Sequence, residues 1–248
     1  SGLNAQLIDV TSSNAVLSLF GPKARDILQV VTLNDVSDNG HPFGSARQIS
    51  IAGCPVLALR ITYVGELGWE LHFPVEYAQT IYNTLIEAGL PLGLRNAGYR
   101  AIETLRLEKG YRAWSSDIGP DHTPDEAGLG WAIKMKSNIS FKGREAIAKQ
   151  RAKGIKKIMA TFTTDSEVIL SGRETIYRNG ERCGWLSSAG FGHTIGKFIG
   201  MGYVRNDGYI DPDFVLSGEY ELEVATKRVR ANVCLKPLYD PKLEKVKT

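Results

Sequence analysis

Cysteine is scarce in this chain, and long hydrophobic runs are missing. The 248 residues include three cysteines, Cys54, Cys183 and Cys234, which lie far apart and form no CxxC pair. This spacing argues against a zinc knuckle and against a disulfide scaffold, and a reducing compartment fits unpaired thiols. No apolar run approaches the roughly 18 residues that a membrane-spanning helix requires. The sequence therefore predicts no membrane partner and no structural metal.

An excess of one charge is also absent. Lys and Arg number 30 and Asp and Glu number 27, which gives a net charge of only +3. A nucleic-acid-binding domain concentrates its basic residues on one face, so this weak excess predicts no nucleic-acid partner. Hydrophobic residues make up 43% of the chain, which excludes a disordered protein. At roughly 150 residues per domain, the length fits one large or two small domains.

Strand and helix patterns alternate in the N-terminal part of the chain. Apolar alternation predicts strands where residues of one face are buried, and Pro or Gly marks where helices begin and end. The expected strands are Ala15–Phe20, Arg47–Ile51, Leu57–Tyr63 and the segment around Trp69, Leu71 and Phe73. The expected helices run from Pro22 through Leu28 and over Glu76–Ala88, Ala97–Lys109 and Phe141–Lys153. This order predicts an α+β layer.

The sequence pattern changes after Gly154, where short strand-like runs follow one another. They are Ile158–Phe162, Glu174–Arg178, Cys183–Leu186, Ile199–Val204, Tyr220–Val224 and Val229–Leu235. Asn179-Gly180 between two of them is a strong hairpin signal, and regularly spaced short strands predict a barrel or sandwich. We place the boundary between two domains here, at 1–153 and 154–248. Lys242–Thr248 is a charged tail that we expect to be solvated.

An acidic cluster with one histidine precedes the helix at 141–153. It contains Asp117, Asp121, His122, Asp125 and Glu126. Thr123 and Glu126 match a capping box, in which each side chain bonds the backbone of the other residue. We therefore interpret the cluster as helix capping rather than as a metal site, and we expect a short helix through Leu129.

The hairpin TYVGELGWELHFP is the most informative segment. Alternation places Glu70 and His72 on the face opposite Trp69, Leu71 and Phe73, and Tyr63 ends the preceding arm. An aromatic ring beside a carboxylate suits a flat heterocycle with adjacent N–H donors, because the ring stacks and the carboxylate accepts two parallel hydrogen bonds. A solvated glutamate on a strand is the alternative.

This hairpin resembles that of the aminomethyltransferase (glycine-cleavage T-protein) family. The likeness continues through AGYRAIETLRLEKGYRAW, SSDIGPDHTPDEAGLGWAIK and FKGREA, and resumes at RNGERCGWLSSAGFGHTIGKFIGMGYV. It covers roughly residues 13–240. The sequence of these segments is more similar to the flavin-linked sarcosine and dimethylglycine dehydrogenases, and it looks most like the sarcosine branch.

The resemblance implies a fold and a set of binding residues. The implied fold is an α+β folate-binding region, incomplete at its N-terminus, followed by a C-terminal antiparallel β-barrel. The implied cofactor is tetrahydrofolate, held by Tyr63, Glu70 and Tyr111. We expect Arg106 and Glu108, in the LRLE segment, to be buried ion-pair or surface partners rather than ligands. T-proteins carry an Arg in an ARD triplet that corresponds here to Ala101-Ile102-Glu103, so a free-standing transferase is disfavoured.

The same resemblance implies an enzyme of which this chain is one part. No GxGxxG follows a strand here, so we expect FAD to bind a flavin domain that precedes Ser1 and the catalytic residues to lie upstream as well. The chain alone is then not expected to carry the redox activity. The implied reaction is oxidative demethylation of sarcosine in the mitochondrial matrix. Dimethylglycine dehydrogenase, a free-standing aminomethyltransferase and the non-enzymatic pyruvate dehydrogenase phosphatase regulatory subunit are the alternatives.

Overall fold

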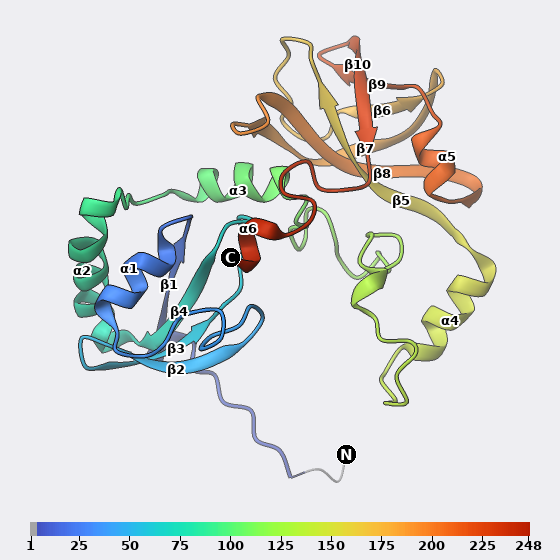
Figure 1. Cartoon of the computed structure of the whole chain (residues 1–248). Coiled ribbons are helices and arrows are strands. Elements are labelled where there is room, and N and C mark those ends of the chain that lie inside the picture. Colours follow the sequence, from blue (N-terminus) through green and yellow to red (C-terminus); the bar gives the residue numbers. More distant parts are fainter. Residues whose placement is uncertain (1–3) are drawn as a thin grey trace. The chain divides into compact units, whose positions relative to one another are not determined.

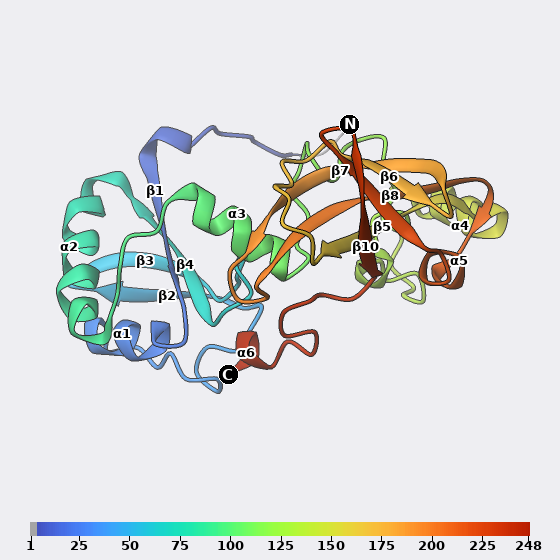
Figure 2. The same cartoon turned by 90° about the horizontal axis from the view of Figure 1, so that it is seen from above.

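The computed structural model describes residues 4–248, which form two compact units (Figures 1 and 2). The first unit reaches Gly98 and also contains Lys242–Thr248, and the second spans Tyr99–Pro241. None of the helices in the described residues has the length and apolar character needed to cross a membrane.

The first unit is built on a four-stranded antiparallel sheet. Its strands are β1 (Asn14–Phe20), β2 (Ala46–Ile51), β3 (Cys54–Leu59) and β4 (Gly68–Pro74), in the order β1-β4-β3-β2. Its helices are α1 (Ala24–Val31), α2 (Ala78–Gly89) and the short α6 (Glu244–Lys247). The tight turn between β2 and β3 uses positive φ angles at Ala52 and Gly53, which confirms the hairpin predicted at Gly53.

One face of this sheet is the core of the unit. Trp69, Leu71 and Phe73 of β4 are at most 1% exposed and pack with apolar residues of α1 and α2. The alternate residues, Glu70 and His72, are half-buried and lie on the other face. The predicted division of β4 into an apolar and a polar face is therefore confirmed.

The second unit contains a closed antiparallel barrel with the strand order β10-β5-β8-β7-β6-β9. The strands are β5 (Ile155–Thr164), β6 (Thr175–Arg178), β7 (Glu181–Gly192), β8 (Lys197–Ile210), β9 (Tyr220–Val224) and β10 (Lys227–Cys234). The helices of this unit are α3 (Tyr99–Glu108), α4 (Arg144–Lys153) and α5 (Pro212–Leu216). The sequence prediction of an α+β region followed by a β-barrel is confirmed.

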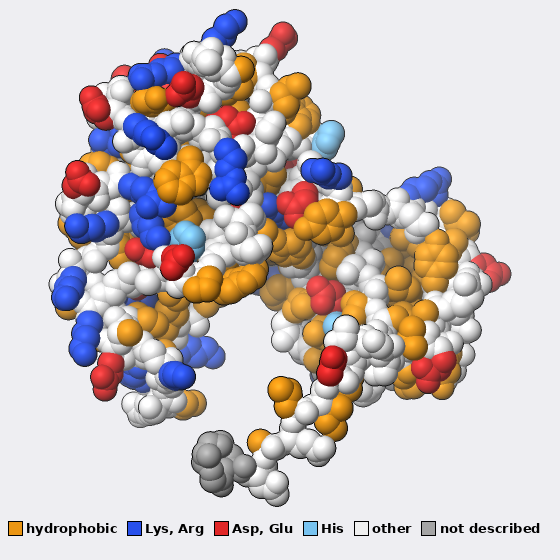
Figure 3. Space-filling view, turned by 180° about the vertical axis from the view of Figure 1, so that it is seen from behind, with side chains coloured by type: hydrophobic (Ala, Val, Ile, Leu, Met, Phe, Trp, Pro, Cys, Tyr) orange, Lys and Arg blue, Asp and Glu red, His pale blue; other side chains and the backbone are white. Residues whose placement is uncertain are grey.

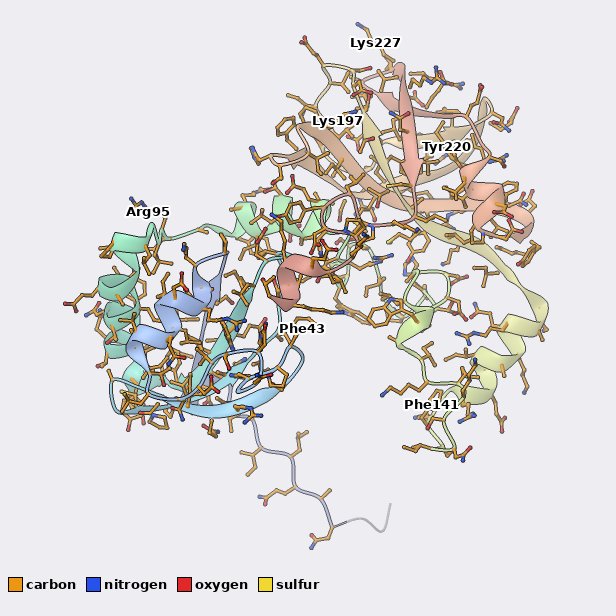
Figure 4. The ribbon with its side chains drawn as sticks, in the orientation of Figure 1. Phe43, Arg95, Phe141, Lys197, Tyr220 and Lys227 are labelled. Carbon is orange, nitrogen blue, oxygen red and sulfur yellow. The ribbon has the colours of Figure 1, made fainter. Side chains whose placement is uncertain are left out.

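The barrel interior is lined by apolar side chains from alternate strand positions. Phe162, Ile176, Leu186 and Leu222 are fully buried there, and Figure 4 shows Tyr220 on the barrel and Lys227 at its outer end. Asn179 and Gly180 adopt φ angles of 51° and 85°, which are the left-handed values that a two-residue hairpin turn needs.

Two local predictions were wrong in detail. The strand expected over Leu57–Tyr63 is β3, which begins at Cys54 and ends at Leu59, so Tyr63 lies in the following loop. The capping box at Thr123 and Glu126 forms both of its hydrogen bonds, but the segment makes only a turn rather than a helix. Gly128, with a φ of 68°, ends that turn almost at once.

The expectation of a solvated C-terminal tail holds for its charged residues, which are exposed, but the segment is also anchored to the first unit. Lys242–Thr248 belongs to the first unit and forms α6 there, and Val246 is only 1% exposed. The carbonyl oxygen of Thr248 accepts hydrogen bonds from Arg25 and Arg60. The charged side chains are therefore solvated as predicted, while one buried valine and two arginines hold the segment in place.

Candidate functional site

The loop between β3 and β4 carries Tyr63 and has a defined shape. Oγ1 of Thr62 accepts hydrogen bonds from the backbone N–H groups of Val64 and Gly65, at 3.2 and 3.1 Å. Gly65 adopts a φ of 80°, a value that costs glycine little because it has no Cβ. The loop backbone is therefore held by local bonds, and Tyr63 is half-buried within it.

Arg60 fixes the start of this loop. Its guanidinium is 1% exposed, forms an ion pair with Asp38 and donates to the backbone oxygens of His41 and Thr248 at 2.8 and 3.0 Å. Arg60 also lies 5.7 Å from the ring centre of Trp69, within the range of a cation–π contact. One buried cation thus joins the sheet, the 38–41 loop and the C-terminal segment, three residues before Tyr63.

Glu70 and His72 form a polar pair on the open face of the sheet. Oε2 of Glu70 lies 3.5 Å from Nε2 of His72, and their side chains are 29% and 33% exposed. Within residues 4–248, that nitrogen has no hydrogen-bond partner, and no Lys or Arg forms an ion pair with Glu70. A carboxylate without a cationic partner retains its full capacity to accept hydrogen bonds from a ligand.

Apolar and small side chains surround this pair. In the strand register, Glu70 lies between Ser18 of β1 and Leu59 of β3, and His72 lies between the residues at 16 and 57, a valine and a leucine that are both exposed. Same-face neighbours on adjacent strands contact one another. The result is a shallow floor with polar acceptors at its centre and apolar flanks, which suits one face of a flat ring.

Tyr111, the third predicted residue, belongs to the second unit. It follows Gly110 at the end of α3, and its backbone N–H donates to the carbonyl of Arg106 at 2.9 Å. Burial raises the pKa of its hydroxyl group, with Asp240 contributing further. Tyr63 and Glu70 thus both belong to the first unit and Tyr111 to the second, and their joint role in binding stays a prediction.

Arg106 forms a buried ion pair, which is one of the two roles that the sequence predicted for it. The guanidinium contacts Asp117 at 2.6 Å and Glu103 at 2.8 Å, and it also donates to Ser188. Asp117 is fully buried and accepts further hydrogen bonds from Ser187 and Ser188. Both serines reach Asp117, although successive strand residues normally point to opposite faces, because the β7–β8 register shifts between Leu186 and Ser188.

Glu108 is buried as well, but its oxygen accepts backbone N–H groups of Thr194 and Ile195 rather than an ion pair. The other acidic residues of the predicted cluster also have structural partners: Asp125 binds Arg151 through both carboxylate oxygens, and Glu126 caps Thr123. No group of three or more His, Cys, Asp or Glu side chains in residues 4–248 is arranged to hold a metal ion.

Sequence reasoning placed His72 on the same face as Glu70 by period-two spacing but assigned it no role in the site. It missed Arg60 altogether. Arg60 gave no such signal, because its partners at 38, 41 and 248 are distant in sequence.

Comparison with known proteins decides the family. The family described as GCVT N-terminal domain matches residues 2–137, which is more than half of the chain. The chain belongs to the glycine-cleavage T-protein family. A second match, to the glycine cleavage T-protein C-terminal barrel domain, covers residues 157–240. In this T-protein-type chain the second match coincides with the closed barrel. The compact units divide at Gly98. The domain boundary at Gly154 stays a prediction.

Several members of the family resemble the chain over nearly its whole length. Mouse mitochondrial sarcosine dehydrogenase is 44% identical over 244 residues, which are 98% of this chain and 27% of that protein. The aminomethyltransferase of Halothermothrix orenii is 35% identical and covers 84% of this chain and 57% of that protein. Among solved structures, aminomethyltransferase T from Bartonella henselae has a TM-score of 0.76 and 24% identity over 92% of this chain and 60% of that one, which supports the fold alone.

Proposed function

We propose that this T-protein-type chain is the tetrahydrofolate-binding portion of a sarcosine dehydrogenase-like flavoprotein. The chain spans only about a quarter of the length of mouse sarcosine dehydrogenase, so the oxidation itself is assigned to residues outside it. The observation that carries the proposal is the Glu70 carboxylate, which faces away from the core and has no cationic partner among the described residues.

The arrangement around Glu70 fits the pterin head of a folate. A pterin presents adjacent N–H donors along one edge, and a carboxylate accepts two parallel hydrogen bonds from such an edge. Nε2 of His72 lies 3.5 Å from that carboxylate, so the histidine can help to hold Glu70 in position. Tyr63 contributes an aromatic ring from a loop held by local hydrogen bonds, and Tyr111 of the second unit stays a prediction.

Tetrahydrofolate, when bound, would accept the one-carbon unit released by the amine oxidation as 5,10-methylenetetrahydrofolate. The residues of this chain contribute placement: Glu70 fixes the orientation of the ring, and Tyr63 restricts its position. Positioning a reactant raises its effective concentration by several orders of magnitude. We assign no residue of this chain as a catalytic acid or base.

The proposal includes a cellular location and two further parts. FAD would bind a separate flavin domain of the same enzyme, and the mitochondrial names of the relatives support a mitochondrial protein, for which we propose the matrix. Dimethylglycine oxidation is the principal alternative, because human dimethylglycine dehydrogenase is 36% identical over 205 residues. The residue at the ARD position, Ile102, disfavours a free-standing transferase.

The test of the binding site is Glu70→Ala. A hydrogen bond to a charged group contributes about 1.5–3 kcal/mol, so we expect tetrahydrofolate to bind about 10- to 150-fold more weakly. Isothermal titration calorimetry on the full 248-residue chain measures the affinity under reducing, oxygen-free conditions.

A matched variant controls for general effects of removing a carboxylate. Glu87→Ala changes an exposed glutamate on α2, the helix on the opposite side of the sheet, and should leave the affinity unchanged. Equal affinities of Glu70→Ala and the unmodified chain would reject Glu70 as a folate ligand, and failure of the unmodified chain to bind tetrahydrofolate would reject the proposed function.

A further inference from the structure

A cavity lies wholly within the barrel unit, and all the residues that line it belong to that unit. Its volume is about 930 Å³, and five of the side chains that line it are cations: Lys156, Lys157, Arg178, Arg182 and Arg205. In the space-filling view from behind, Lys and Arg side chains gather around apolar side chains on this part of the barrel (Figure 3). The volume falls in the range of pockets that hold one small molecule.

Two of these cations are held close together by the sheet itself. Lys157 of β5 and Arg205 of β8 are directly opposite each other in the strand register, which places their Cβ atoms about 4.5–5.5 Å apart. Like charges in this arrangement destabilise a sheet. The positive field also reaches His122, because burial and then the charge of Lys157 lower the pKa of its imidazole. An anion in the cavity would relieve this repulsion.

The cavity wall also carries three carboxylates, Glu126, Glu181 and Asp207, so the five cations leave a net positive charge of two. Among the described residues, Lys156, Arg182 and Arg205 form no ion pair, and Lys157 is 3.9 Å from the nearest oxygen of Glu126. Arg178 is committed differently, since its guanidinium donates to the carbonyl of Phe214. Three cations are therefore available to a ligand.

The cavity also offers an aromatic surface. Trp185 is 40% exposed, and the guanidinium of Arg205 stacks 4.4 Å from the centre of its ring. A stacked indole and guanidinium present flat, polarisable surfaces on which a planar heterocycle can rest. The acidic residues Glu181 and Asp207 on the cavity wall are exposed, and their oxygens can accept hydrogen bonds from ligand hydroxyl or amino groups.

Strands β5, β7 and β8, which carry many of these residues, depart from regular pairing at the cavity. In β7, Arg182 pairs with Tyr177 and Gly184 with Ile176, so Cys183 is an extra residue. In the β5–β8 ladder the register jumps from Lys157↔Arg205 to Ile155↔Ile210. Such bulges re-aim side chains and occur preferentially beside functional sites.

From these observations we propose that the cavity binds a nucleoside di- or triphosphate. The phosphates contact Lys156, Arg182 and Arg205, and the base lies against the Trp185–Arg205 stack. Charge-assisted hydrogen bonds from Arg and Lys to phosphate oxygens are strong and directional, and the ring adds contact area that a bare phosphate lacks. This site is independent of the proposed folate site.

The experiment titrates ADP, inorganic pyrophosphate and adenosine separately into the full chain and follows heat by calorimetry. We expect ADP to bind at least about tenfold more tightly than either fragment, a difference of about 1.4 kcal/mol. The affinity should fall as NaCl is raised, because salt screens exposed charges. No ADP binding below 1 mM (roughly −4 kcal/mol) would overturn the proposal, and equal binding of ADP and pyrophosphate would overturn the nucleoside assignment.

Variants separate this cavity from other basic surfaces. Arg205→Gln should weaken ADP about tenfold or more, a loss of about 1.4 kcal/mol, and Trp185→Leu should weaken ADP while leaving pyrophosphate unchanged. The control is Arg228→Gln, an exposed barrel arginine outside the cavity that lies near Glu221. Equal losses in Arg205→Gln and Arg228→Gln would show non-specific attraction and reject the site. A thermal melt of each variant verifies folding, and tetrahydrofolate affinity should be unchanged in all of them.

Discussion

Tyr220 shows how burial changes one titratable side chain. Its ring packs edge-on against Phe162 in the barrel, and its hydroxyl donates to the carbonyl of Val215 at 2.8 Å. Burial raises the pKa of this hydroxyl to about 12 from an ordinary value of 10.0. The folded protein therefore keeps a proton that the unfolded chain loses first.

The raised pKa of Tyr220 makes the folded protein less stable as the pH rises above 10. Below pH 10 both states hold the proton, and the contribution to stability is complete. As the pH rises from 10 towards 12, mainly the unfolded chain ionises, so the free energy of unfolding falls by up to about 3 kcal/mol. In Tyr220→Phe this fall should be smaller, as measured by urea denaturation at pH 9, 10 and 11.

Other tyrosines set the comparison for that measurement. Burial also raises the pKa of Tyr203 and Tyr111, so part of the fall will remain in the variant. Tyr209→Phe removes an exposed hydroxyl and should retain the full fall. If Tyr220→Phe and Tyr209→Phe lose stability equally between pH 9 and 11, burial of Tyr220 is not the cause.

At the scale of elements, one buried carboxylate ties three segments of the second unit together. Asp117, in the loop after α3, binds Arg106 of α3 and two serines of β7. Removing one partner of a buried pair leaves an uncompensated charge and typically costs about 3–5 kcal/mol. Asp117→Ala should therefore lower the free energy of unfolding by about that amount in guanidinium denaturation.

An exposed ion pair on the same barrel provides the matched comparison. Lys197 and Asp165 lie 2.6 Å apart, but their side chains are 41% and 66% exposed. Exposed pairs contribute at most about 1 kcal/mol, so Asp165→Ala should be nearly neutral. Similar losses in both variants would mean that burial does not set the strength of the Asp117 interaction.

The sequence predicted an element well where the interactions that form it lie close together in the chain. The turn at Asn179-Gly180 and the two faces of β4 follow from a dipeptide and from simple alternation, so the sequence was sufficient for both. Tyr63 was placed at a strand end because the alternation runs past Leu59. The strand stops there because the side chain and backbone of Arg60 bond to residues 41, 44, 45 and 248, which no local pattern reveals.

In the candidate site, too, the sequence was sufficient for features with local causes and insufficient for contacts between distant residues. Glu70 faces away from the core, as alternation requires, and its pairing with His72 on one face follows from the same rule. The buried Arg106 pair was expected, but its partner Asp117 was not singled out. The cations of the barrel cavity come from four separate strands, and only the closed barrel brings them together.

At the scale of the whole molecule, the C-terminal segment is part of the first unit's packing. Val246 is buried, and Thr248 accepts hydrogen bonds from Arg25 and Arg60. Val246→Ala removes buried methyl groups and leaves a cavity, at a cost of about 1.5–3 kcal/mol. We expect faster amide hydrogen exchange around residues 38–45 and 60, with barrel strands unaffected, as followed by mass spectrometry.

The neighbouring Lys247→Ala is the control for that experiment. Lys247 is exposed, and its replacement should leave exchange in both units unchanged. Uniformly faster exchange throughout the barrel of Val246→Ala would contradict the assignment of this segment to the first unit alone.

The polypeptide passes from the first unit to the second near Gly98 and returns near Lys242. A single nick in the first passage would therefore yield two fragments, neither of which holds every piece of the sheet unit. The larger fragment would keep the short closing helix that the smaller one needs to complete its fold. After separation and remixing, the two fragments would have to associate again before the sheet and the half-buried Glu70 regained their native surroundings.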